Sequence, residues 1–262
     1  LNVSPSTNIN NGSLHDTIDF AGLEFVLGDD AKAQSGVAYS VSAGVTHQRR
    51  LTPRLIWENL ASVAGTIYDG RGRNNGNYTI GSGLRYTPDT TRPALLYGYV
   101  RYDQRYVADD IGAGVLGDYS AYYRQTTTGL EYHWNPDKTT AWKVYGTYTD
   151  RNSAVSANQN ALIGTVGATY RVTLNSGVAL AFGGYVQGTA GASNLAARAA
   201  NVSLGAAWNP ESVPFGFSAN LAYTHTQYAS ASSGYSKVRV GDDVKLELAL
   251  TYDDYQFYGF KP

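Results

Sequence analysis

The feature that most constrains this sequence is an alternation of apolar and polar residues with a period of two, which is clearest over residues 243–252. The even-numbered positions hold Val, Leu, Leu, Leu and Tyr, and the odd-numbered positions hold Asp, Lys, Glu, Ala and Thr. Successive side chains of a β-strand point to opposite faces, so the pattern predicts a strand with one apolar and one charged face. A soluble β-sandwich could produce such a strand once. The fold class therefore depends on how often the chain repeats it.

The chain repeats this kind of segment along most of its length. Pro- or Gly-containing turns fall near positions 53, 88, 136, 176 and 210, and longer loops rich in Gly, Ser, Asn and Asp lie between them. Short turns at one end and longer loops at the other are typical of an outer-membrane barrel. We therefore predict an all-β fold, an antiparallel transmembrane β-barrel of the outer-membrane type, with about twelve strands in this chain. The predicted strands are residues 37–50, 54–68, 77–86, 93–106, 121–134, 140–150, 161–172, 178–187, 198–208, 215–227 and 242–252, preceded by the tail of a strand at residues 1–5.

Composition agrees with a barrel and argues against several other classes. The chain has 22 Tyr against 7 Phe and 4 Trp, and aromatic side chains with a polar tip suit a membrane interface. No apolar run approaches the roughly 18 residues of a membrane-spanning helix. The net charge of -1 indicates neither nucleic-acid binding nor an acidic tail. The absence of Cys excludes disulfides and Cys-based metal sites in this chain, and the absence of Met predicts a processed or excised piece.

The alternation also predicts which side chains face lipid and which face the lumen. Both charge signs fall on the predicted lumen side, so we expect a wet interior cross-linked by ion pairs. The Trp residues that flank the short turns are predicted to anchor one membrane interface. The predicted lumen-facing residues are Arg85, Glu131, Lys143, Arg171, Lys245 and Glu247. The predicted lipid-facing or interfacial residues are Trp134, Trp142, Leu180, Phe182, Leu204, Trp208, Leu246, Leu248, Leu250 and Tyr252.

Residues that could carry catalysis or bind metal are sparse. The four histidines, at positions 15, 47, 133 and 225, form no metal-ligand spacing, and we interpret His47 and His133 as rim residues. The pairs Asp29–Asp30 and Asp109–Asp110 lie in predicted loops, where they could bind calcium but are more often solvated. Residues 17–34 mix apolar and acidic side chains without a clean period and are interpreted as part of a large first loop. We predict a protein that is not an enzyme, with no catalytic residues, no cofactor and no metal.

Two patches resemble a known family. The first comprises residues 6–13, 16–19, 22–23 and 29–37, and the second comprises residues 242–252 and the closing Gly-Phe-Lys-Pro at 259–262. Both are similar to the barrel domain of surface lipoprotein assembly modifiers, the Slam family. The resemblance implies a barrel of fourteen strands that is preceded by a periplasmic helical-repeat domain. On this interpretation residues 1–262 are a single barrel domain, truncated at both ends, and the final hairpin lies beyond Pro262.

The resemblance implies a translocator in the outer membrane of a Gram-negative bacterium. Its partners would be a client lipoprotein or other secreted protein, outer-membrane lipids and lipopolysaccharide, and periplasmic chaperones, with no nucleic acid. Two alternatives use the same folding physics: a passive, porin-like channel for small solutes, and a structural or adhesin barrel. No functional residue of the family is carried over to this chain.

Overall fold

The described part of the molecule consists almost entirely of β-strands, most of them long. The structure is a computed structural model, and it describes residues 2–6, 17–20, 23–26, 36–68, 74–88, 94–108, 119–174, 177–191, 196–209, 215–229 and 240–252. Its strands are β1 (Asn2–Ser6), β2 (Thr17–Phe20), β3 (Leu23–Val26), β4 (Gly36–Thr52), β5 (Leu55–Tyr68), β6 (Asn75–Tyr86), β7 (Ala94–Ala108), β8 (Tyr119–Trp134), β9 (Thr140–Ser153), β10 (Ala161–Thr173), β11 (Val178–Gly191), β12 (Ala197–Trp208), β13 (Phe215–Tyr228) and β14 (Val240–Tyr252). One 3₁₀ turn, η2 (Ala157–Gln159), follows β9.

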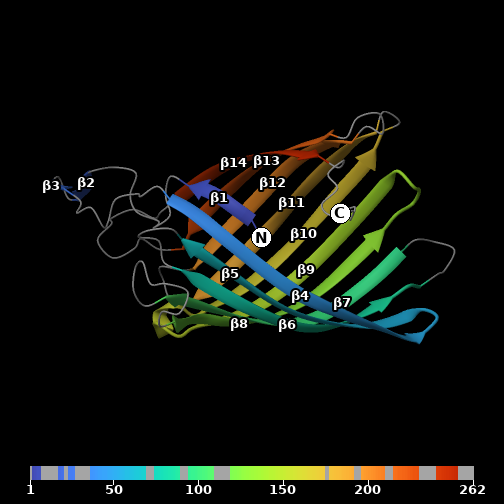
Figure 1. The fold of residues 1–262 in the computed structure, drawn as a ribbon, viewed down its shortest axis with the longest axis horizontal. Coiled ribbons are helices and arrows are strands. Elements are labelled where there is room, and N and C mark those ends of the chain that lie inside the picture. The colour runs from blue at the N-terminus through green and yellow to red at the C-terminus, as the bar shows by residue number, and fades with distance from the viewer. Residues whose placement is uncertain are drawn as a thin grey trace, which may run out of the picture.

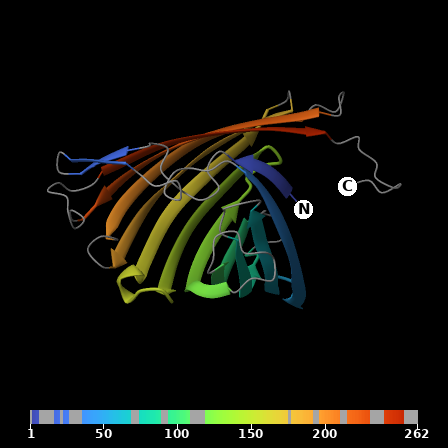
Figure 2. The ribbon, with the colours of Figure 1, turned by 60° about the vertical axis from the view of Figure 1, so that its left-hand side comes forward.

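Twelve of these strands form one antiparallel sheet in the order β1-β4-β5-β6-β7-β8-β9-β10-β11-β12-β13-β14. From β4 onward each strand pairs with the next one along the chain, so the sheet is a continuous meander (Figure 1). The sheet curls round on itself, as Figure 2 shows, and thus has a concave inner face and a convex outer face. The predicted all-β antiparallel fold is confirmed. Among the described residues the ladder of paired strands ends at β1 on one side and at β14 on the other.

Several element boundaries differ from the sequence-based prediction. Residues 17–34 were expected to form an irregular loop, but Thr17–Phe20 and Leu23–Val26 pair as a separate two-stranded hairpin. Some strands also run further than predicted: β9 continues to Ser153 and β11 to Gly191. Backbone hydrogen bonds continue where the apolar and polar alternation has already stopped, because the ladder needs no apolar face. Periodicity alone therefore placed these strand ends too early.

The short turns are held by local hydrogen bonds. In the turn between β8 and β9, Oδ1 of Asp137 accepts hydrogen bonds of 2.7 Å from both the backbone NH and the hydroxyl of Thr139. It also accepts one of 2.7 Å from the backbone NH of Thr140. These bonds stabilise the carboxylate and lower the pKa of Asp137. Between β10 and β11, Gly177 adopts a φ of 77°, which other residues rarely adopt, so glycine is required there.

The apolar side chains of the described residues do not form a packed interior. Ala108 and Ala161 are the only apolar residues that are buried in the described part of the chain. By contrast, Val45, Val166, Val186 and Val202 are each exposed by 60 % or more. A soluble β-sandwich would bury its apolar faces against each other, so this distribution argues against that alternative. No helix among the described residues has the length and apolarity needed to cross a membrane.

Candidate functional site

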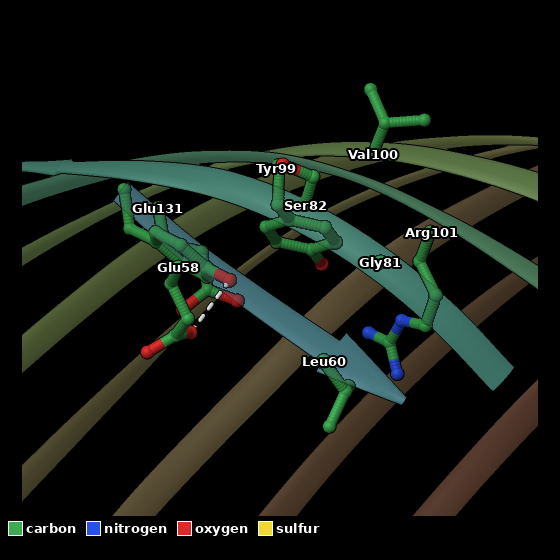
Figure 3. A pocket seen from close by; sticks show the side chains of 9 residues that line it. Glu58, Leu60, Gly81, Ser82, Tyr99, Val100, Arg101 and Glu131 are labelled. Carbon is green, nitrogen blue, oxygen red and sulfur yellow. Dashed lines mark hydrogen bonds between the residues drawn. The ribbon is translucent and has the colours of Figure 1, made fainter. Parts of the chain in front are cut away.

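The strand register brings charged and aromatic residues of different strands together on the inner face. Across β6 to β9, Arg85 lies opposite Tyr97, Tyr97 opposite Glu131, and Glu131 opposite Tyr145. Directly opposed residues of antiparallel strands point to the same face. Figure 3 shows this from close by: Tyr99 and Arg101 point to one side of the sheet, and Val100 between them points to the other. The inner wall of β4 to β9 is therefore the candidate functional site.

Glu58 on β5 is the centre of the first polar cluster. Its side chain is nearly inaccessible, since the residue is only 7 % exposed. Nη2 of Arg85 lies 2.9 Å from its Oε2, Nε2 of Gln48 donates to the same oxygen over 2.6 Å, and the hydroxyl of Tyr97 donates to Oε1 over 3.0 Å. A buried carboxylate must be paired and hydrogen-bonded to be tolerated, and Glu58 has three partners. The cluster thus ties β4, β5, β6 and β7 together on the inner face.

Glu131 on β8 is the centre of a second cluster. Nζ of Lys143 lies 3.1 Å from its Oε2, and Nε2 of His133 lies 2.8 Å from the same oxygen. His133 was interpreted as a rim residue from its place beside Trp134; it is the penultimate residue of β8, and its ring contacts the Glu131 carboxylate. The two clusters share Tyr97, which bonds Glu58 and lies opposite Glu131 in the register. Fixed charges of both signs therefore occupy one continuous area.

Cations stack on tyrosine rings along the same wall. The guanidinium of Arg85 lies 5.0 Å from the ring centre of Tyr97, and that of Arg101 lies 5.5 Å from the ring centre of Tyr99. Nζ of Lys143 lies 5.1 Å from the ring of Tyr145. Such contacts hold a cation in place without neutralising it. Tyr97 and Tyr99, together with Glu58, Arg101 and Glu131, line a small cavity of about 140 Å³ (Figure 3). Its other lining residues are Leu60, Gly81, Ser82 and Val100.

The opposite wall, from β10 to β13, carries mostly small neutral residues on the inner face. Thr165 pairs with Gln187, Gly183 with Ser203, and Gly205 with Asn220, all on the face of the charged clusters. The larger exceptions are Ile163, Arg171, Tyr185, Gln187 and Tyr228. The inner surface is therefore asymmetric, with long charged and aromatic side chains on one wall and a smooth polar wall facing it. The small inner residues of this wall include Thr165, Gly167, Thr169, Ala179, Ala181, Gly183, Ala199, Asn201, Ser203, Gly205, Ala207, Ser218, Asn220, Ala222 and Thr224.

Aromatic side chains lie on the outer face at the strand ends next to the short turns. Trp134 and Trp142 lie directly opposite each other, and both are 42 % exposed. The rings of Trp142 and Tyr170 lie 4.4 Å apart, and Tyr170 in turn lies 6.3 Å from Phe182. Between these rings and the far strand ends, exposed apolar side chains on the outer face include Val100, Leu130, Val144, Val166, Val202 and Leu204. The outer face is thus an apolar band with an aromatic edge.

The structure divides the residues singled out from the sequence between these two faces. Arg85, Glu131, Lys143, Arg171, Lys245 and Glu247 all occupy register positions on the inner face. Trp134, Trp142, Leu180, Phe182, Leu204, Trp208, Leu246, Leu248 and Leu250 occupy positions on the outer face. Tyr252 lies opposite Phe215 in the register, and its side chain is outside the described part of the structure. Contact with lipid or with lumen water remains a prediction for all of them.

Sequence reasoning missed Glu58, Gln48, Tyr97 and Arg101. One signal pointed to Glu58, since it is the only charged residue within Leu55–Tyr68, a strand that is otherwise apolar or neutral. A lone carboxylate in such a strand requires a partner from another strand. Which strand supplies that partner depends on the register, which the sequence does not show.

His47 and His225 each contact a residue of a neighbouring strand. The ring of His47 packs edge to face on Trp57 at 6.3 Å, and Nδ1 of His225 lies 2.8 Å from Asp242. No group of three or more His, Cys, Asp or Glu side chains suited to a metal occurs among the residues that the structure describes. His15 and the pairs Asp29–Asp30 and Asp109–Asp110 lie outside those residues. The described residues of the site offer fixed charges, hydrogen-bond donors and aromatic rings.

Comparison with known proteins adds no family assignment. A scan against protein-family models gives no match to this chain, and a search of curated proteins gives no significant one.

Proposed function

We propose that this chain is a β-barrel of a bacterial outer membrane, closed between β14 and β1, that helps client polypeptides reach the cell surface. The observation that carries the proposal is the division of the sheet into two faces. On β14, the outward residues Val244, Leu246, Leu248 and Leu250 are 63–71 % exposed, whereas Lys245 and Glu247 point inward. An apolar surface of this extent requires lipid or a partner to cover it. A polar face on the other side of the same strands suits a water-filled lumen.

The dimensions of the outer face support a membrane location. On β12 the outward row runs from Arg198, at the loop end, to Trp208, at the turn end. With a rise of about 3.4 Å per residue and a tilt of about 45°, this row spans about 24 Å. The apolar band of an outer-membrane barrel is about 25 Å tall. A charged residue at one end and an indole at the other match the two membrane interfaces.

The asymmetry of the inner face supports a polypeptide as the transported molecule. A client polypeptide carries side chains of every kind. A wall without large side chains or fixed charges neither obstructs nor binds such a polypeptide as it passes. The inner positions of β10 to β13, such as Gly183, Ser203 and Gly205, provide such a wall. The resemblance of the terminal patches to the Slam barrel favours a lipoprotein client. Polar clusters on the facing wall keep the lumen hydrated and hold the strands in register.

The test is the surface exposure of a co-expressed candidate lipoprotein, measured by protease shaving and antibody labelling of intact cells. We expect exposure with the wild-type protein and its loss with Gly205→Trp, which places an indole on the smooth inner wall. Ala206→Trp is the matched control, because Ala206 is the next residue and lies on the outer face. Unchanged exposure of every candidate lipoprotein in the absence of this protein would contradict the translocator proposal.

A passive channel is the second candidate, and one observation favours it. The inner ion pairs and cation–aromatic stacks fix the charges of β6 to β9 in place, as in a permanent pore lining. Single-channel recording of the full-length protein in planar bilayers separates the candidates. A steady, high conductance without a client supports the passive channel. A closed state that opens only in the presence of client supports the translocator.

A further inference from the structure

A shallow hollow lies on the outer face near the loop ends of β10 to β13. It has a volume of about 450 Å³, which falls in the range of roughly 300–1,000 Å³ typical of ligand sites. Gly164 and Gly188 lie directly opposite each other in it, and a Cβ atom on either would meet nothing within 4 Å. The hollow exists because these glycines present no side chain between flanking valines. Its apolar lining is completed by Val166, Val186 and Ala200.

One edge of this hollow is polar. Arg198 lies opposite both Gly188 and Gln227 in the register, so its side chain belongs to the outer face. Arg198 is exposed, and within the described part of the chain no carboxylate lies at ion-pair distance from it. His225 and Gln227 line the same edge. An unpaired guanidinium beside an apolar surface is thus the main feature that a ligand would meet.

The nearby carboxylate does not neutralise this guanidinium. Oδ1 of Asp242 accepts a hydrogen bond of 2.6 Å from the hydroxyl of Tyr223 and lies 2.8 Å from Nδ1 of His225. Both contacts are made on β13, on the side of His225 that faces β14, whereas Arg198 is on β12. The carboxylate therefore holds His225 in place and leaves the charge of Arg198 for another partner.

We propose that this hollow binds one phosphate-bearing membrane lipid, with an acyl chain over Gly164 and Gly188 and the phosphate on Arg198. The inference rests on the membrane location proposed above. Shape and charge fit this occupant: the hollow is apolar toward the middle of the outer face and cationic at its loop end, where β12 reaches the membrane interface. A guanidinium is the group best suited to hold a phosphate by paired hydrogen bonds. A peptide or nucleic acid fits less well, because a single cation beside an apolar surface gives neither backbone pairing nor a charged track.

The test uses the full-length protein in detergent, with lipid binding measured by native mass spectrometry. Dioleoylphosphatidylglycerol is the probe, dioleoylglycerol is the same acyl pair without phosphate, and inorganic phosphate is the headgroup alone. We expect one bound phosphatidylglycerol and an affinity about tenfold lower in Arg198→Gln, the factor for losing one charge-assisted hydrogen bond. Gly188→Leu, which fills the hollow, should weaken binding in the same way. Arg124→Gln is the matched control, since Arg124 is an outward, exposed arginine on β8 that lies outside the hollow.

Each outcome decides the proposal. Equal affinity in Arg198→Gln and wild type, or equal retention of dioleoylglycerol, would overturn the phosphate contact. Inorganic phosphate that binds as tightly as the lipid would overturn the acyl contact. Flotation of the same preparations with liposomes separates this inference from the proposed function. If the variants float with liposomes and bind phosphatidylglycerol as tightly as the wild type, only the lipid site is rejected. If the wild-type protein fails to float, the membrane location and the lipid site are both rejected.

Discussion

The ring of Tyr145 on β9 occupies the space that a Cβ atom on Gly167 of β10 would need. The two residues lie directly opposite each other in the register, and such an atom would lie 2.5 Å from both Cζ and Oη of the tyrosine. Tyr99 meets Gly129 in the same manner two strand pairs away, across β7 and β8. Tyr145 and Tyr99 therefore each rest on a glycine of the neighbouring strand, and their rings pack against the sheet itself.

Substitution of Gly167 by alanine tests this packing. The added methyl group must displace the Tyr145 ring, so we expect Gly167→Ala to lower the free energy of unfolding by about 1–3 kcal/mol. Gly164→Ala is the matched control on the same strand, because its Cβ would point to the outer face and meet nothing within 4 Å. Urea titration of the protein in detergent, followed by tryptophan fluorescence, gives both values. Equal values for the two variants would mean that the tyrosine is free to move away.

The network around Glu58 gives a second prediction. Glu58→Ala leaves Arg85, Gln48 and Tyr97 without their common acceptor, and we expect a loss of about 1–3 kcal/mol in the free energy of unfolding. Glu247→Ala removes a carboxylate that is also paired on the inner face, but that pair is exposed to water by more than half. The second change should leave the urea midpoint unchanged, because exposed ion pairs contribute little. A midpoint that falls equally in both variants would show that burial does not determine the strength of these clusters.

The alternation was sufficient to divide the residues of a strand between two faces, but it did not show which residues of different strands meet. Alternation assigns Lys245 and Leu246 to opposite faces without any knowledge of the neighbouring strand. The contact of Glu58 with Tyr97 joins strands that are not adjacent and residues that are 39 positions apart. It depends on two successive registers, and a slip of one residue in either would turn one partner to the other face. The hairpin of Thr17–Phe20 and Leu23–Val26 was missed because its four-residue strands are too short to show a period.

The hydrogen bonds to Asp137 in the turn between β8 and β9 predict that the stability of the folded protein depends on pH. The pKa of Asp137 is lowered from 3.8 in the folded protein, first by the hydroxyl and backbone NH of Thr139. A depressed pKa means that the ionised form stabilises the fold at pH values above 3.8, and that this contribution is lost as the pH falls through the lower, folded-state pKa. The difference in urea midpoint between wild type and Asp137→Asn should therefore shrink below pH 3.8. A difference that stays constant across this range would show that the carboxylate charge is not what holds the turn.

Adjacent positions on β14 test the membrane location directly. Leu248 is 63 % exposed on the outer face and Ala249 lies on the inner face, opposite Ser218. An arginine near the bilayer midplane of a barrel costs roughly 2–4 kcal/mol, whereas one that faces a wet lumen costs less. We expect Leu248→Arg to lower the stability of the protein in liposomes by that amount and Ala249→Arg to be tolerated better. Equal damage from the two changes would mean that the face assignment or the membrane location is wrong.

The inner face also predicts the charge preference of ions that enter the lumen. Three carboxylates, Glu58, Glu131 and Glu247, are tied to cations by ion pairs. Arg101 and Arg105 have no such partner among the described residues. Among those residues, cations also outnumber carboxylates at the inner register positions. The inner cations are Arg50, Arg85, Arg101, Arg105, Lys143, Arg151, Arg171 and Lys245, and the inner carboxylates are Glu58, Asp103, Glu131, Asp243 and Glu247.

A positive lumen attracts anions and repels cations, most strongly at low ionic strength. In planar bilayers with a potassium chloride gradient, we expect the reversal potential of any open state to show preference for chloride over potassium. The double variant Arg101→Glu and Arg105→Glu should move the reversal potential toward potassium, because it exchanges two inner cations for carboxylates. Arg124→Glu introduces the same change on the outer face of β8 and should leave the selectivity as it is. A reversal potential that responds to Arg124→Glu and not to the inner pair would invert the assignment of the two faces.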